Sequence, residues 1–161
     1  VVCKIDTLNM SNEGLYTFDL HVKNREKIAI IITAGDSKIN HGVFVYNKID
    51  KIATEDEEVG IIDPKSFVFT FRDKNLMKYE MKDIRQNKPT IFIGGKRHEN
   101  ALSVGNKDII ISKDANEYCI NNDTCFYDYN GVQHALTGSD SKANRNDGKI
   151  RVSNIVVIQF K

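Results

Sequence analysis

The sequence predicts a β-rich α+β fold, in which two antiparallel β-sheets pack as a sandwich with a few short peripheral helices. Two observations predict it. Short apolar and β-branched runs recur along the 161 residues, separated by turn residues, whereas convincing amphipathic helices are scarce. Strands that follow one another through hairpin turns form antiparallel sheets. The length fits one domain. We therefore expect residues 1–161 to be a single domain, excised from a longer protein because no initial methionine is present.

The N-terminal part predicts an early strand and then a hairpin. Val1 to Ile5 alternates apolar with other residues, as a half-buried strand does. Residues 27–33 form an almost continuous apolar run, which is typical of a strand buried on both faces. A turn at 34–37 and a returning strand at 39–46 follow. Residues 15–22 have both helical and strand spacing, so the pattern leaves their structure open.

The rest of the chain continues as strands joined by turns. An acidic stretch, residues 54–58, is expected to be a connection that ends near Asp63-Pro64. Residues 66–71 (Ser-Phe-Val-Phe-Thr-Phe) alternate, so that three phenylalanines share one face of a strand. Later strands are expected at 76–79, 90–93, 101–104, 108–112 and 150–160, with turns at 73–75 and 105–106.

Composition limits the possible functions and locations. A formal net charge of +1 argues against a strongly electrostatic grip on nucleic acid. The three cysteines, Cys3, Cys119 and Cys125, are odd in number and widely spread, which does not predict a disulfide framework. We expect reduced thiols and an intracellular, cytoplasmic location. No run approaches the ~20 apolar residues of a membrane helix, so no membrane insertion is expected.

Metal and cofactor motifs are not recognisable. The stretch 128–131 resembles a calcium loop only faintly, because two essential oxygen ligands are missing. Asn130-Gly131 instead predicts a two-residue hairpin turn. We expect no metal and no cofactor, because no two of the histidines have metal-binding spacing: His21, His41, His98 and His134.

Catalytic motifs are equally unsupported. Gly94-Gly95-Lys96 lacks the leading glycine and the following hydroxyl of a phosphate-binding loop, and a glycine pair after a strand is more typical of a bend. No nucleophile elbow of the G-x-S-x-G type occurs. The sequence therefore predicts no catalytic residues and a protein that is not an enzyme.

The most basic loop is the candidate interaction site. It contains Gly94, Gly95, Lys96, Arg97 and His98, with Lys88 nearby in the sequence. Such a loop can contact an anionic partner, although charged loop tips are more often simply solvated. The acidic residues 55–58 are likewise typical of a solvated face, and could dock a basic partner.

Taken in order, these segments resemble the TLDc domain of oxidation-resistance proteins. The resemblance begins with Ile28-Ala-Ile-Ile-Ile-Thr33 and His41-Gly-Val-Phe-Val-Tyr46, and includes Ser66-Phe-Val-Phe-Thr-Phe71. Further matching segments are Met77-Lys78-Tyr79, Ile91-Phe-Ile-Gly-Gly95, Ala101-Leu-Ser-Val104, Asp108-Ile-Ile-Ile111 and Val152 to Phe160. The chain resembles a divergent member, because Val156 and Ile158 stand where many relatives have glutamate and tryptophan. Ala101 and Ser103 likewise replace a glycine and a tryptophan.

The resemblance implies a sandwich of two antiparallel sheets and a non-catalytic interaction domain linked to the oxidative-stress response. In several relatives the partner is the vacuolar proton-pumping ATPase, so a protein partner of this kind is expected. A nucleic-acid-binding, stress-responsive regulator is the alternative hypothesis. A second alternative is a cryptic enzyme or a thiol-based peroxide scavenger that uses Cys3, Cys119 or Cys125. The sequence leaves the oligomeric state open.

Overall fold

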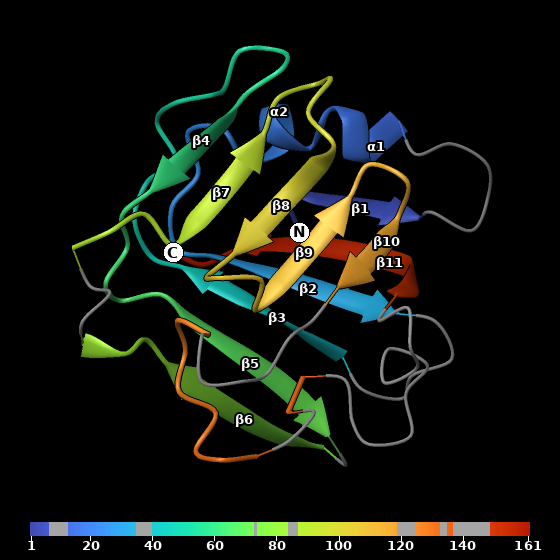
Figure 1. Cartoon of the computed structure of the whole chain (residues 1–161). Coiled ribbons are helices and arrows are strands. Elements are labelled where there is room, and N and C mark those ends of the chain that lie inside the picture. The colour runs from blue at the N-terminus through green and yellow to red at the C-terminus, as the bar shows by residue number, and fades with distance from the viewer. Residues whose placement is uncertain are drawn as a thin grey trace.

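The computed structural model describes residues 1–6, 13–34, 40–72, 74–83, 87–118, 125–132, 135–136 and 149–161 (Figure 1). The strands are β1 (Cys3–Asp6), β2 (Ile28–Ala34), β3 (Asn40–Val45), β4 (Glu58–Ile61), β5 (Phe67–Arg72), β6 (Asn75–Glu80), β7 (Ile91–Gly94), β8 (Asn100–Val104), β9 (Ile109–Ser112), β10 (Asn116–Tyr118) and β11 (Lys149–Gln159), and the helices are α1 (Glu13–Tyr16) and α2 (Phe18–Val22). Strands dominate, and both helices are short, which confirms the predicted β-rich fold class.

The strands form two antiparallel sheets that share β11. Sheet A has the order β1-β11-β2-β3-β5-β6, and sheet B has the order β4-β7-β8-β9-β10. The start of β11 pairs with β10, and its longer remainder pairs with β2 and β1. A bulge between Val152 and Asn154 marks the change of partner, because an extra residue bends a strand and increases its twist. In Figure 1 the strands of sheet B cross in front of those of sheet A.

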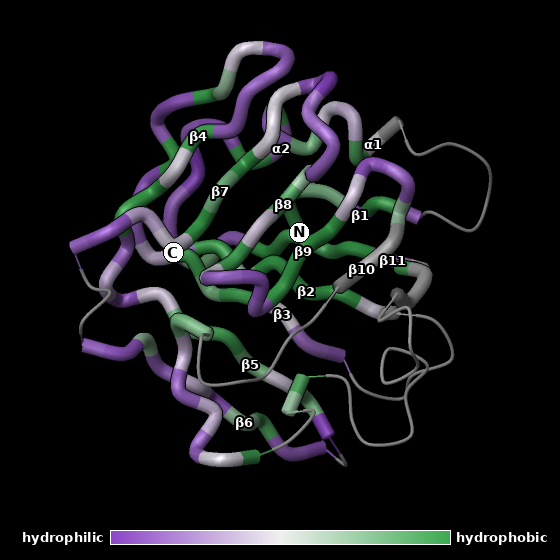
Figure 2. The backbone as a smooth tube through the Cα atoms, viewed as in Figure 1, coloured by the Kyte–Doolittle hydropathy of each residue, from purple (hydrophilic) through white to green (hydrophobic). Residues whose placement is uncertain are grey.

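The core lies between the two sheets. On β2, the side chains of Ile28, Ile30 and Ile32 are fully buried and face this core, whereas Ile31 on the opposite face is partly exposed. The sequence predicted that this strand is buried on both faces. The face toward the core is fully buried, whereas the opposite face is only partly buried. Figure 2 shows the apolar character of β2, β9 and β11, with polar residues in the connections. Each fully buried isoleucine contributes roughly 1.5–3 kcal/mol to folding.

The segment that the sequence left open, 15–22, is helical. Leu15, Phe18 and Val22 are buried in the core and have helical spacing, which decides between the two possible patterns. A Cβ atom on Gly14 would lie 2.9 Å from two side-chain carbons of Ile5, so α1 packs closely against the core face of β1. The helices therefore close one open side of the sandwich, with α1 against β1 and α2 against β7.

Three details differ from the sequence-based expectations, and the first is the short strand β10, which was not predicted. Residues 58–61, expected within a connection, form the edge strand β4, which pairs with β7. The turn at Asn130-Gly131 is confirmed, because both residues have positive φ (53° and 74°) and the amide of Val132 donates to the carbonyl of Tyr129. The described residues on either side of it form no strands, so the turn does not join a hairpin there.

A buried carboxylate holds the 125–129 segment against sheet B. Asp108 is fully buried and accepts hydrogen bonds from the backbone amides of Asn106 (2.9 Å), Phe126 (3.0 Å) and Tyr127 (3.2 Å), and from the Tyr129 hydroxyl (2.8 Å). Burial raises the pKa of Asp108, although these four donors oppose the shift. Segment 125–129 has almost no regular secondary structure, and the hydrogen bonds to the Asp108 carboxylate hold it in place.

Candidate functional site

The predicted interaction loop, residues 94–98, connects β7 to β8. Its two glycines are required by close backbone approach. A Cβ atom on Gly94 would lie 1.9 Å from the carbonyl oxygen of Asn100, and one on Gly95 would lie 1.9 Å from that of Thr54. The bend predicted at this glycine pair is therefore confirmed, and both glycines have a structural role in shaping the loop.

The structure places the acidic stretch directly beside this basic loop. The amide of Gly95 donates to the carbonyl of Glu57 (2.8 Å), and the amide of Arg97 donates to the carbonyl of Glu55 (2.6 Å). The Arg97 guanidinium also forms a salt bridge of 3.1 Å with the Glu55 carboxylate. The two oppositely charged segments, which the sequence analysis treated separately, thus form one surface because β4 pairs with β7.

Arg97 and His98 are therefore engaged within the domain. The Arg97–Glu55 salt bridge is exposed, and such bridges contribute only about 0–1 kcal/mol. The Nδ1 atom of His98 accepts a hydrogen bond from the Asn100 amide (3.2 Å), and its Nε2 atom lies 3.9 Å from the Glu58 carboxylate. Both side chains have an acidic neighbour that competes for them with an external anion.

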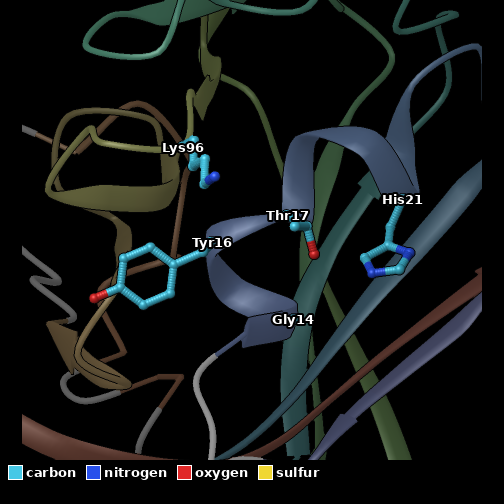
Figure 3. Close-up of a pocket in the computed structure, with 5 residues that line it drawn as sticks. All are labelled: Gly14, Tyr16, Thr17, His21 and Lys96. Carbon is cyan, nitrogen blue, oxygen red and sulfur yellow. The ribbon is translucent and has the colours of Figure 1, made fainter.

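Lys96 differs from the other two cations of the loop, because it lines a depression with a volume of about 530 Å³. The depression is open and lies between the loop and the helices. Figure 3 shows Lys96 above the turn that carries Tyr16 and Thr17, with His21 further along α2. Its lining combines an ammonium group, an imidazole, a hydroxyl group and an aromatic ring. Of these groups, the Lys96 ammonium is the one that could attract an anionic group such as a carboxylate.

A buried lysine supports the helices that line the depression. Lys113 is 4% exposed, and its Nζ atom donates to the Leu15 carbonyl at the end of α1 (2.8 Å). The same Nζ atom lies 5.9 Å from the ring centroid of Tyr16. Burial lowers the pKa of Lys113, whereas the negative charge of Asp19 opposes this shift. Lys113 therefore fixes the short helix α1, which could not be stable by itself.

Lys88 does not belong to this site. The sequence analysis placed it near the basic loop, but it precedes β7 whereas Lys96 follows it. The four residues of that strand separate the two by roughly 13 Å. Lys88 and the loop therefore lie at opposite ends of an extended strand.

Gly14, Tyr16, Thr17 and His21 were not singled out as site residues by the sequence. No spacing rule connects residues 14–21 with a loop some 75 residues later. The only available signal was the opposite charge of residues 55–58 and 96–98, which favours their proximity but says nothing about the helices.

Other candidate chemistry is limited in the described part of the chain. There, no group of three or more His, Cys, Asp or Glu side chains could hold a metal ion. Over the same residues, no helix is long and apolar enough to cross a membrane. Cys3 is partly exposed and Cys125 is buried, while Cys119 and His134 lie outside the described residues.

The chain was compared with models of known protein families and with curated protein sequences, and it matches none of them.

Proposed function

We propose that this protein is a non-catalytic interaction domain of the TLDc type, which binds a protein partner in the oxidative-stress response. Lys96 carries this proposal, because it is the cation of the loop that faces the depression while Arg97 and His98 are engaged with acidic neighbours. The loop is also rigidly built, since its backbone is hydrogen-bonded to residues 55 and 57. A preorganised loop loses little conformational entropy on binding.

The positions of the strands also support the TLDc assignment. The segments that resemble the family, from residues 28–33 to 152–160, coincide with β2, β3, β5, β7, β8, β9 and β11. By this resemblance, the vacuolar proton-pumping ATPase is the first partner to test. The acidic side chains beside the loop would repel a phosphate backbone, so the same surface favours a protein partner over nucleic acid.

Binding of the domain to the purified ATPase tests this proposal. We expect the wild-type domain to bind and Lys96→Glu to lose at least about tenfold in affinity, because a cation at the depression becomes an anion. Lys51→Glu is the matched control, since it changes the net charge equally at another exposed position.

If Lys51→Glu weakens binding as much as Lys96→Glu, then net charge and not the depression determines affinity. If the wild type does not bind the ATPase, the domain is used to capture partners from lysate of peroxide-treated cells. Failure of the wild type to recover any partner there contradicts the interaction proposal itself. Binding to DNA at low salt, lost steeply as salt increases, would support the nucleic-acid alternative.

A further inference from the structure

A second surface, on the far side of sheet A from the core, has an unusual composition for an outer face. Residues that are directly opposite in the register share one face of a sheet, and the pairs Phe44–Phe67 and Gly42–Phe69 lie on the side away from the core. We call this surface the aromatic face; its apolar residues are Ala29, Ile31, Phe44, Phe67, Phe69, Phe71, Val156, Ile158 and Phe160.

The aromatic rings form one continuous row. Phe44 stacks on Phe67 with centroids 5.1 Å apart and planes 8° apart, and it also contacts Phe160 at 5.8 Å. Phe69 lies 6.3 Å from Phe67 and 5.7 Å from Phe71, both at steep angles. The row therefore runs from Phe160, directly after β11, to β3 and β5, and the Lys78 ammonium lies 4.5 Å from the centroid of the Phe67 ring.

Both ends of this row are in contact with solvent, Phe44 and Phe67 are partly exposed, and Phe69, which lies between Phe67 and Phe71, is only 4% exposed. Phe160 is 50% exposed and Phe71 is 39% exposed, while the neighbouring Leu76 on β6 is 55% exposed. Helix α1 cannot cover the row, because it packs against Ile5 on the opposite side of β1. Exposed apolar side chains grouped on one face in this way are typical of an interaction site.

The charges around the aromatic face indicate what covers it. One edge carries Lys4 and Asp6 on β1, and the other carries Lys78 and Glu80 on β6, which form a salt bridge of 2.9 Å. Each edge of the aromatic face therefore carries both positive and negative charges. An interface between identical copies must be complementary to itself, so a rim of one sign would repel its own copy whereas a mixed rim does not. The net charge of +1 adds almost no general repulsion.

The area of the aromatic face is also suitable for an interface between two copies of the chain. The six described strands of sheet A are β1-β11-β2-β3-β5-β6. With a spacing of about 4.8 Å and a length of about 20 Å, they cover roughly 500 Å² in projection. Protruding side chains make the accessible area larger than this projection. The area is therefore close to the roughly 800 Å² per partner of a standard interface.

We propose that a second copy of this chain packs against the aromatic face and forms a symmetric, sheet-on-sheet dimer. The Phe160 and Phe71 rings lie at the two ends of the buried row, with Phe44, Phe67 and Phe69 between them, and the mixed charges form its rim. This interface is separate from the Lys96 depression and leaves that site free to bind its partner.

Sedimentation equilibrium of the purified chain, from about 1 μM to about 500 μM, tests the proposal. We expect a reversible monomer–dimer equilibrium that weakens at least tenfold in Phe160→Glu and in Phe71→Glu. Leu20→Glu is the matched control, because Leu20 is 58% exposed and lies on α2, away from this face. Phe160→Ser provides a milder variant if the glutamate variants fail to fold, as judged by circular dichroism.

A wild-type chain that stays monomeric at every concentration overturns the proposal, even if another protein or a lipid vesicle binds the face. A dimer that Leu20→Glu weakens as much as Phe160→Glu also overturns it. Lys96→Glu should leave the dimer unchanged, so that failure of the partner-binding proposal and failure of this one can be told apart.

Discussion

The hydroxyl groups of Ser66 and Tyr127 lie 2.8 Å apart in the interior and join two segments that are 61 residues apart in the sequence. The Ser66 hydroxyl donates its hydrogen to the carbonyl of Asp63 (2.7 Å), so the Tyr127 hydroxyl must be the donor of this pair. Burial raises the pKa of Tyr127 strongly, and the phenol therefore keeps the proton that it donates. The contact ties the start of β5 to the segment that Asp108 anchors.

Removal of both members of this pair is expected to cost less than the sum of the two single removals. Ser66→Ala removes the acceptor of this hydrogen bond in the interior, which should lower the free energy of unfolding by about 1–3 kcal/mol. Tyr127→Phe should cost about 1 kcal/mol. Because the double variant leaves no unsatisfied group in the pair, its cost should be smaller than the sum of the two. Urea unfolding followed by circular dichroism measures all three, and strict additivity would contradict the direct contact.

Asp108→Asn should destabilise the domain because an amide nitrogen cannot accept the hydrogen bonds that the carboxylate accepts. Each carboxylate oxygen accepts two hydrogen bonds: Oδ1 from the amides of Asn106 and Phe126, and Oδ2 from the Tyr127 amide and the Tyr129 hydroxyl. Whichever oxygen the amide nitrogen replaces, two donors therefore lose their acceptor. We expect a loss of about 1–3 kcal/mol in the free energy of unfolding.

This loss should also depend on pH. Because the folded-state pKa of Asp108 is raised, the stability linked to its protonation is fully present below the unfolded pKa of about 3.9 and is lost as pH rises through the folded pKa. In the Asp108→Asn variant, residue 108 has no group that titrates. The stability difference between wild type and Asp108→Asn should therefore be larger at about pH 4 than at about pH 7. A difference that grows with pH would show that the pKa is lowered.

Gly95→Ala should destabilise the loop and weaken binding at the same time. The new methyl group would meet the Thr54 carbonyl at 1.9 Å, so either the loop or the acidic segment must move. Such overpacking costs about 1–3 kcal/mol. Gly131→Ala is the control, because nothing lies within 4 Å of the added atom and only its positive φ opposes alanine. Thermal unfolding should show a larger fall in Tm for Gly95→Ala, and an equal fall would contradict the close approach.

The two described thiols should react slowly in the folded protein, which bears on the peroxide-scavenger hypothesis. Burial raises the pKa of the Cys3 thiol, and Cys125 is only 2% exposed. Since the thiolate is the nucleophile, reaction with a disulfide reagent at pH 7 should be slow in the Cys119→Ser background and should become fast in urea. Raising the pH should accelerate the reaction of Cys3. Two rapidly reacting thiols in the native state would contradict this expectation and favour thiol chemistry.

The sequence by itself determined where most strands lie. Alternation in residues 66–71 and the apolar run at 27–33 are local signals, because side chains two positions apart share a face of a strand. Glycine and asparagine marked the turns at 94–95, 105–106 and 130–131 for an equally local reason. The short strand β4 was missed because its residues Glu58-Val-Gly-Ile61 are those of an edge strand, whose glycine and charge obscure the pattern.

Only the tertiary structure decided which of these segments meet. The pairing of β4 with β7 brought Glu55 to Arg97, and the fold placed Lys96 and His21, roughly 75 residues apart, in the lining of one depression. The same holds for the aromatic face, since alternation predicts that Phe67 and Phe71 share a side but not which side the core covers. Such contacts depend on how the sheets pack and on the closure of loops between residues far apart in the sequence. The local alternation of apolar and polar residues carries no information about either.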